Sequence, residues 1–128
     1  MNTDTKHDAT WDLLDRNTVK DLVDREGAAR ILSTLMSEPP SPDERIHTMC
    51  ALAVDGNIVR LRQETADFLA WAETNGMRRL NNTLIELNRV LALEARGQAI
   101  FQAQALTRFI RLNLDQDIKA FKRAVTSV

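Results

Sequence analysis

The chain has 128 residues, 44% of them hydrophobic and 27% charged, which is typical of a globular domain that buries its own core. A single cysteine, Cys50, excludes an internal disulfide, and no apolar run approaches the about 18 residues of a membrane span. The polar N-terminus lacks the apolar segment of a signal peptide, so we expect a cytoplasmic protein with a disordered tail at residues 1–9 and one domain at residues 10–128.

Charge is unevenly distributed along the chain, although the net charge is only −1. Residues 1–76 hold eight basic and 14 acidic side chains, whereas residues 77–128 hold nine basic and four acidic ones. Two interpretations remain open. Either the two halves pack against each other, or the basic half contacts an acidic partner.

The first helical segment is predicted from Trp11 to Met36, with Thr10 as a possible cap and Thr18, followed by Asp21, as a second possible start. Its apolar residues recur at helical spacing, and Gly27 is the weak point within it. The segment should end before Pro39 and Pro40, because two successive prolines cannot continue a helix.

A clear helix start follows the prolines. Ser41 at the N-cap, Pro42 at the first helical position and Glu44 two residues later form the pattern of a capping box. The sequence Asp55-Gly56-Asn57 should stop this helix and offer Asn57 as the cap of the next one. The next helix is then predicted at residues 58–74.

The stretch from residue 77 to residue 112 contains no proline, and its apolar residues recur at helical spacing. One seam comprises Met77, Leu80, Leu84, Leu87 and Leu91. A second stripe, displaced from the seam, comprises Ala95, Ala99, Ala103, Leu106, Ile110 and Leu114. Gly97 weakens a helix by about 1 kcal/mol without ending it, so we predict one long helix, straight or bent at Gly97. A hairpin broken at Gly97 is the alternative.

An unbroken helix of this length would extend beyond its own domain. The 36 residues would span roughly 54 Å, whereas a compact domain of this size is about 35 Å across. A second copy of the chain would cover the overhanging apolar seam most simply, so we expect a homodimer. A last helix should begin at Asn113 or Asp115, and no segment alternates as a strand would. The predicted fold is an all-α bundle of about five helices.

Few residues are suited to catalysis or metal binding, because the chain has two histidines and one cysteine. Asp43, His47 and Cys50 share one helix face, but a structural zinc site needs four ligands and no second cluster supplies the others. The four glycines are isolated from one another and form no phosphate-binding loop. We therefore predict no metal, no cofactor and no enzymatic activity.

His47 carries one resemblance to a known family. The segment His47-Thr48-Met49-Cys50-Ala51 is similar to the phosphorylated site of histidine-containing phosphotransfer domains, which are also small helical bundles. In that family a lysine follows the histidine by three residues and a glycine by four, whereas Cys50 and Ala51 stand here. The resemblance implies phosphoryl transfer through His47, and the departure removes the charge that would orient the phosphoryl group.

The remaining prediction is a small helical interaction module without enzymatic activity. It would act as a regulator or inhibitor, of the antiactivator, anti-repressor or adaptor type, by covering the surface of a partner protein; compact helical inhibitors from bacteria and their phages have this build. The candidate partner-binding or dimer-binding residues are Leu80, Leu84, Leu87, Leu91 and Phe101 as apolar anchors, with Arg78, Arg89 and Arg96 as flanking charges.

Nucleic acid binding by the basic C-terminal half is the alternative function. On one long helix, Arg78, Arg89 and Arg96 would share the face opposite the leucine seam. If that helix continued, a second basic stripe, interrupted by Asp115, would comprise Arg108, Arg111, Lys119 and Lys122. Such clusters bind phosphate groups. The overall pI of about 6.1, however, is far from that of domains that bind DNA by charge alone.

Overall fold

The computed structural model describes residues 10–93 and 96–127 of the chain. The described residues contain no strand, so the all-α class is confirmed, with six helices where about five were predicted. The helices are α2 (Arg16–Glu26), α3 (Ala28–Ser37), α4 (Pro42–Asp55), α5 (Ile58–Thr74), α6 (Arg78–Leu91) and α7 (Arg96–Ser127). The predicted tail, residues 1–9, lies outside the described part of the chain.

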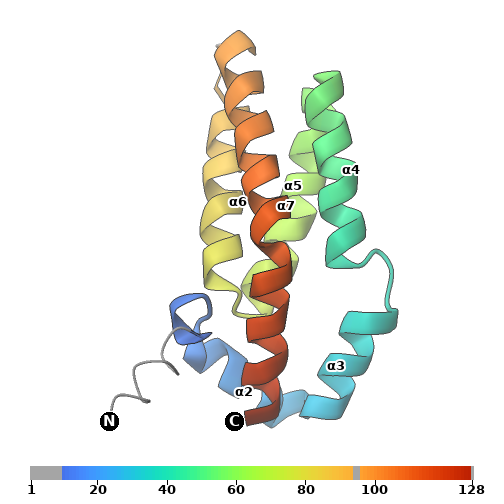
Figure 1. Cartoon of the computed structure of the whole chain (residues 1–128), viewed down its shortest axis with the longest axis vertical. Coiled ribbons are helices and arrows are strands. Elements are labelled where there is room, and N and C mark those ends of the chain that lie inside the picture. Colours follow the sequence, from blue (N-terminus) through green and yellow to red (C-terminus); the bar gives the residue numbers. More distant parts are fainter. Residues whose placement is uncertain (1–9, 94–95, 128) are drawn as a thin grey trace.

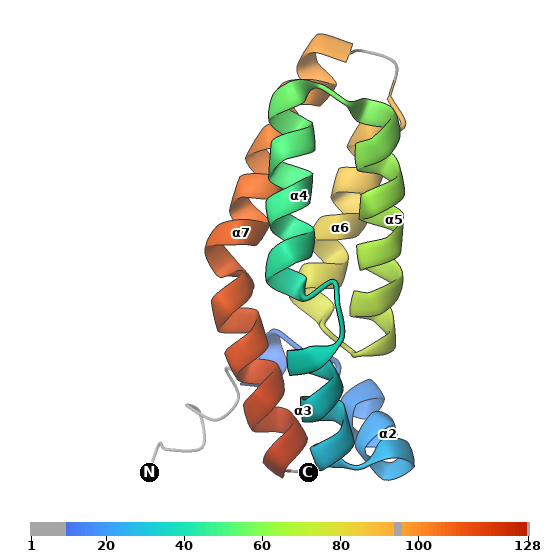
Figure 2. The ribbon, with the colours of Figure 1, turned by 90° about the vertical axis from the view of Figure 1, so that its right-hand side faces the viewer.

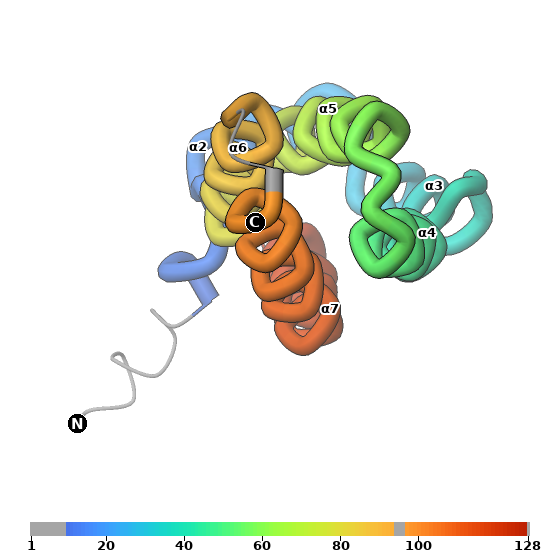
Figure 3. Tube along the Cα trace, turned by 90° about the horizontal axis from the view of Figure 1, so that it is seen from above, coloured from blue at the N-terminus to red at the C-terminus, as the bar shows by residue number. Residues whose placement is uncertain are grey.

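Helices α4, α5, α6 and α7 run side by side, and each is antiparallel to the next (Figure 1). Seen from above, α7 returns to lie between α6 and α4, which closes a ring of four helices (Figure 3). We call these the four-helix group. Helices α2 and α3 lie below it, and the C-terminal part of α7 extends down to pack against them (Figure 2).

One continuous apolar core joins the four-helix group to α2 and α3. Its largest fully buried side chains include Phe68 from α5, Met49 from α4 and Phe121 from α7. Leu14 and Val19 extend the core to the lower end of the molecule, where they are completely buried. Since burial of each such side chain contributes about 1.5–3 kcal/mol, apolar packing is the main force that holds the helices together.

The predicted start and stop of α4 are both confirmed. The Ser41 hydroxyl accepts a hydrogen bond from the Glu44 backbone N–H at 3.1 Å, and Glu44 Oε1 accepts one from the Ser41 N–H at 2.7 Å. Gly56 ends the helix in the left-handed conformation with φ of +70°. Asn57 then caps α5 by accepting a hydrogen bond from the Arg60 N–H at 3.2 Å, and α5 has the predicted bounds.

The helical segment predicted from Trp11 to Met36 is interrupted twice, at residues 13–15 and at Gly27, so α2 begins at Arg16 and neither Thr10 nor Thr18 is its cap. Asp15 caps α2 by accepting a hydrogen bond from the Thr18 N–H at 3.3 Å. Gly27 has a φ of +82°, which non-glycine residues rarely adopt, and so it separates α2 from α3. Helix α3 ends at Ser37, in agreement with the predicted stop before the prolines.

The predicted single helix over residues 77–112 is wrong. Helix α6 ends at Leu91, Ala92 and Leu93 form a turn, and α7 starts at Arg96, so the chain reverses direction just before Gly97. Both apolar stripes can then face the same core, whereas a straight helix would carry the second stripe away from it. Packing of the two faces prevails over the helical propensity of this stretch.

The predicted new helix at Asn113 or Asp115 is also wrong, because α7 continues to Ser127. The Asn113 amide donates a hydrogen bond to the Phe109 carbonyl, one turn earlier at 2.8 Å, instead of capping a new helix. The 32 residues of α7 span roughly 48 Å. None of the described helices, α7 included, combines the length and the apolar character that crossing a lipid bilayer requires.

Candidate protein-binding surface

The leucine seam of α6 lies in the core of its own chain. Leu80, Leu84, Leu87 and Leu91 are between 0 and 3% exposed. The seam stabilises the four-helix group, and in this conformation it cannot contact a partner. Because the helix is broken and its apolar side is covered, no overhanging seam remains for a second copy of the chain to cover.

The three predicted arginines do not share one face. Arg78 is exposed at the start of α6, and Arg89 lies eleven residues later on the same helix. Arg96 belongs to α7, beyond the reversal of the chain, and its side chain lies outside the described part of the structure. Arg89 binds Glu86 through two hydrogen bonds, one of 3.0 Å from Nε. This pairing lowers the pKa of Glu86 and raises that of Arg89.

Phe101, the remaining predicted anchor, is 75% exposed on α7. Two further large apolar residues of α7 point the same way: Phe109 is 46% exposed and Leu112 is 74% exposed. With the exposed Ala105 they are spaced by 4, 4 and 3 residues, which places them on one side of the helix. We call Phe101, Ala105, Phe109 and Leu112 the α7 outer face.

The opposite side of α7 holds the helix against the core. It buries Ala99, Ala103, Thr107, Ile110 and Leu114. Two polar contacts fix its position on α4: the Gln104 amide donates to the Ala53 carbonyl at 3.2 Å, and the Cys50 thiol donates to the Thr107 carbonyl at 3.6 Å. This inner stripe includes four of the residues predicted from the sequence, and its burial turns the α7 outer face toward solvent.

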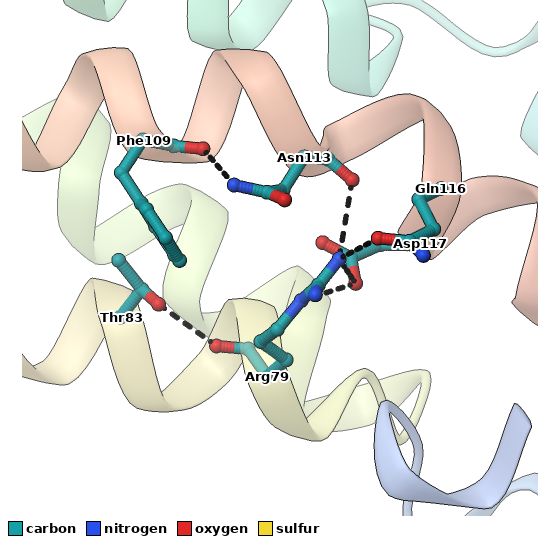
Figure 4. A network of polar contacts seen from close by, with 6 residues as sticks. All are labelled: Arg79, Thr83, Phe109, Asn113, Gln116 and Asp117. Atoms are coloured by element: carbon teal, nitrogen blue, oxygen red, sulfur yellow. Dashed lines mark hydrogen bonds and ion pairs between the residues drawn. The ribbon is translucent and has the colours of Figure 1, made fainter. Parts of the chain in front are cut away.

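An ion pair between α6 and α7 fixes the rotation of α7 further down (Figure 4). Arg79 Nε donates to Asp117 Oδ1 at 3.0 Å, and Arg79 Nη2 lies 2.9 Å from the same oxygen. Nη2 also donates to Gln116 Oε1 at 2.9 Å. Burial raises the pKa of Asp117, and the Arg79 guanidinium opposes this rise.

Phe109 marks the edge of the α7 outer face that borders α6. In Figure 4 its ring points toward Thr83, whose hydroxyl donates to the Arg79 carbonyl at 3.0 Å. The ring is therefore partly covered by α6, which explains why Phe109 is less exposed than Phe101 and Leu112. The most accessible part of the face lies on the side toward α4.

Basic residues flank that side. Arg108 and Arg111 are exposed, and among the described residues neither lies within ion-pair distance of a carboxylate. Farther along α7, Lys119 pairs with Asp115 at 3.0 Å. Within the described ranges, no ion pair joins residues 1–76 to residues 77–128. The acidic and basic halves thus pack through apolar contacts and hydrogen bonds without an ion pair between their described residues, and the charges of Arg108 and Arg111 are not neutralised in this way.

His47 is exposed on α4 and lines a hollow of about 570 Å³ together with Arg111 of α7. Asp43 and Glu44 line the same hollow. The structure thus places a cation near the histidine, which the sequence alone did not indicate. The two carboxylates would disfavour a phosphoryl group there, because like charges repel.

A second hollow, of about 910 Å³, lies between the α4–α5 turn and the α6–α7 turn. Its described walls are formed mostly by apolar and small residues, with Arg62 as the one ionisable side chain among them. Across residues 10–93 and 96–127, no three His, Cys, Asp or Glu side chains gather to hold a metal ion.

No family model, curated protein or solved structure matches this chain. Sequence reasoning identified Phe101 but missed Phe109 and Leu112. A usable signal existed, since both lie opposite the Ala99–Leu114 stripe once that stripe is assigned to the core.

Proposed function

We propose that this chain is a helical interaction module without enzymatic activity, which regulates or inhibits a partner protein by covering part of its surface. The α7 outer face is the docking surface in this proposal. It replaces the α6 seam, whose leucines are buried.

The observation that carries the proposal is the exposure of Phe101 and Leu112 on a helix that is otherwise well packed. Each is about three-quarters exposed, although both lie on the same rigid helix as a fully buried inner stripe. Large apolar residues gathered on one exposed face often mark a site of protein association. A helix that presents anchors at spacings of three and four residues is a common way to bind a partner.

Site-specific photo-crosslinking in the native cell tests this proposal. A photoreactive phenylalanine analogue is placed at position 112 and, as a matched control, at position 59, because Val59 is 80% exposed on α5, the helix diagonally across the four-helix group from α7 (Figure 3). We expect one discrete protein adduct from position 112 and none of the same mass from position 59. Absence of any adduct from position 112, or identical adducts from both positions, would contradict the proposal.

Nucleic acid binding is the second candidate, and the unbroken course of α7 favours it. Because the helix continues through residue 115, Arg108, Arg111 and Lys119 all belong to one rod. Duplex DNA binding, measured by fluorescence anisotropy at about 50 and about 200 mM salt, should weaken steeply with salt and with Arg108→Ala. Arg60→Ala, on the exposed surface of α5, is the control.

A further inference from the structure

We propose that the α7 outer face binds an acidic amphipathic helix, whose carboxylates lie along Arg108 and Arg111. This inference rests on the proposed function and adds the chemistry of the partner. It is carried by the shape of the face, by its charge and by the poor fit of other occupants.

The apolar area of the face suits a single helix. Phe101, Phe109 and Leu112 together expose on the order of 400 Å² if each side chain is assigned about 200 Å² when fully exposed. Ala105 lies between them and has only a methyl group. The small side chain at this position leaves room beside the larger residues for a leucine of a partner helix to pack against them.

The charge of the face is positive. The sequence of α7 contains no Asp or Glu from its start to Leu112, so neither Arg108 nor Arg111 has a carboxylate one turn away on the N-terminal side. Asp115, one turn after Arg111, is held by Lys119 at 3.0 Å, and Asp117 is buried against Arg79. An apolar strip with a cationic edge complements a helix that is apolar on one side and acidic beside it.

Carboxylates from α4 do not remove this charge. Asp43 and Glu44 line the hollow that Arg111 borders. Glu44 Oε1 is already bonded to the Ser41 N–H, and neither carboxylate is within 4.0 Å of an arginine nitrogen in the described structure. Arg108 lies one turn farther from them along α7 and is therefore the better probe of charge recognition.

Two other occupants fit less well. A second copy related by a twofold axis would pair the face with itself, and the axis would pass near residues 105–108. The two copies of Arg108 would then approach each other, and like charges at an interface are unfavourable. Nucleic acid would leave the apolar side chains of Phe101 and Leu112 facing a charged phosphate backbone, which offers them no apolar contact.

The test uses the full chain and two labelled synthetic helices of about 15 residues. Both helices carry the same leucines at positions i, i+4, i+7 and i+11; one has glutamates beside the leucines and the other has lysines. Binding is measured by fluorescence anisotropy. The chain variants are Arg108→Glu with Arg60→Glu as control, and Leu112→Ala with Val59→Ala as control, since Val59 is comparably exposed but lies on α5.

We expect the acidic helix to bind at least about tenfold more tightly than the basic one, and Arg108→Glu to reverse that order. Leu112→Ala should weaken binding by about tenfold, while both control variants bind as the native chain does. If the two helices bound with equal affinity and Leu112→Ala still weakened their binding, the proposed acidity of the partner would be wrong. The α7 outer face would still be the docking surface. Failure of both helices together with failure of the photo-crosslinking would reject the docking face itself.

Light scattering and DNA titration of the same samples address the other occupants. A dimer at micromolar concentration that Leu112→Ala dissociates would identify a second copy as the occupant and overturn the inference. DNA binding that depends on Arg108, with no binding of the acidic helix, would overturn it in favour of nucleic acid.

Discussion

The ion pair between Arg79 and Asp117 allows a quantitative test of how α6 holds α7. The Asp117 side chain is 4% exposed and that of Arg79 is 26% exposed. Arg79→Met would leave the Asp117 carboxylate buried without its cation and without the hydrogen bond of 3.0 Å from Nε. Removing one partner of a buried ion pair costs roughly 3–5 kcal/mol. Because domains of this kind have a free energy of unfolding of about 5–15 kcal/mol, the variant should lose a large part of its stability.

Urea denaturation followed by far-ultraviolet circular dichroism measures this loss. The control is Arg78→Met, since Arg78 is the exposed neighbour of Arg79 and its replacement should change the free energy of unfolding by less than about 0.5 kcal/mol. The double variant Arg79→Met with Asp117→Leu should recover most of the native stability, because no buried charge remains. Equal midpoints for the Arg78 and Arg79 variants, or a double variant as unstable as the single one, would refute this account.

The same pair predicts a pH dependence with a definite sign. Burial raises the pKa of Asp117 above its ordinary value, while Arg79 opposes the shift. The native state therefore takes up a proton at higher pH than the unfolded chain does, so this group lowers stability as the pH rises through its raised pKa. Arg79→Met removes the opposing effect, and this variant should regain more stability on mild acidification than the native protein. In Asp117→Asn this contribution should disappear.

Five further substitutions test the local determinants of the fold by the same denaturation assay. Ser41→Ala removes one half of the capping box and should cost about 1 kcal/mol; no loss would mean that the cap does not stabilise α4. Gly76→Ala should cost about 1–3 kcal/mol, since its φ is +68° and the added methyl group would lie 3.0–3.1 Å from atoms of α2 and its cap. In Gly97→Ala the added methyl group would have no atom within 4 Å, and the free energy of unfolding should rise by up to about 1 kcal/mol. If Gly97→Ala destabilised the protein and Gly76→Ala stabilised it, both expectations would be contradicted. Leu84→Ala, in the core, should cost about 2–5 kcal/mol, whereas Leu112→Ala should change stability by less than about 0.5 kcal/mol; similar losses would mean that Leu112 supports the fold.

Local signals in the sequence predicted the helix boundaries where a specific side chain makes the cap. Ser41 and Asn57 have hydrogen-bonding groups that satisfy the free N–H groups of a helix start, and both cap as expected. Gly56 supplies the left-handed conformation that ends α4. Such boundaries depend on residues within one turn of each other, so a single sequence contains the information needed.

The reversal after Leu91 could not be predicted from local signals, because no capping residue or proline marks it. The information lay in the change of phase between the seam that ends at Leu91 and the stripe that contains Ala99. Two apolar stripes of different phase on one straight helix would face different directions, and only a reversal lets both reach one core. At Asn113 and Asp115 a helix start was predicted where the helix continues. Both residue types can cap a helix, but here the Asn113 amide donates to the Phe109 carbonyl and Asp115 pairs with Lys119, all within α7.

The prediction of buried leucines as docking residues failed for a related reason. A stripe at helical spacing shows that one side of a helix is covered, but it does not reveal whether the chain or a partner covers it. The structure separates these cases, because the α6 seam is covered by its own chain and the α7 outer face is not. The polar surroundings of Phe101, Phe109 and Leu112 in the sequence made this second face difficult to distinguish from scattered surface residues.

If the α7 outer face is a docking surface, its residues should affect binding independently of the inner side of the helix, which supports the fold. The inner side accounts for the position of the helix through buried apolar contacts and the Arg79–Asp117 pair. Phe101 and Leu112 contribute little to that position, so polar residues there would serve the fold equally well. A substitution at Leu112 should accordingly change binding while stability is preserved, and a substitution at Leu84 should lower stability and affect binding only through unfolding. If the two sites were instead coupled, the exposure of Leu112 would no longer indicate a separate role in recognition.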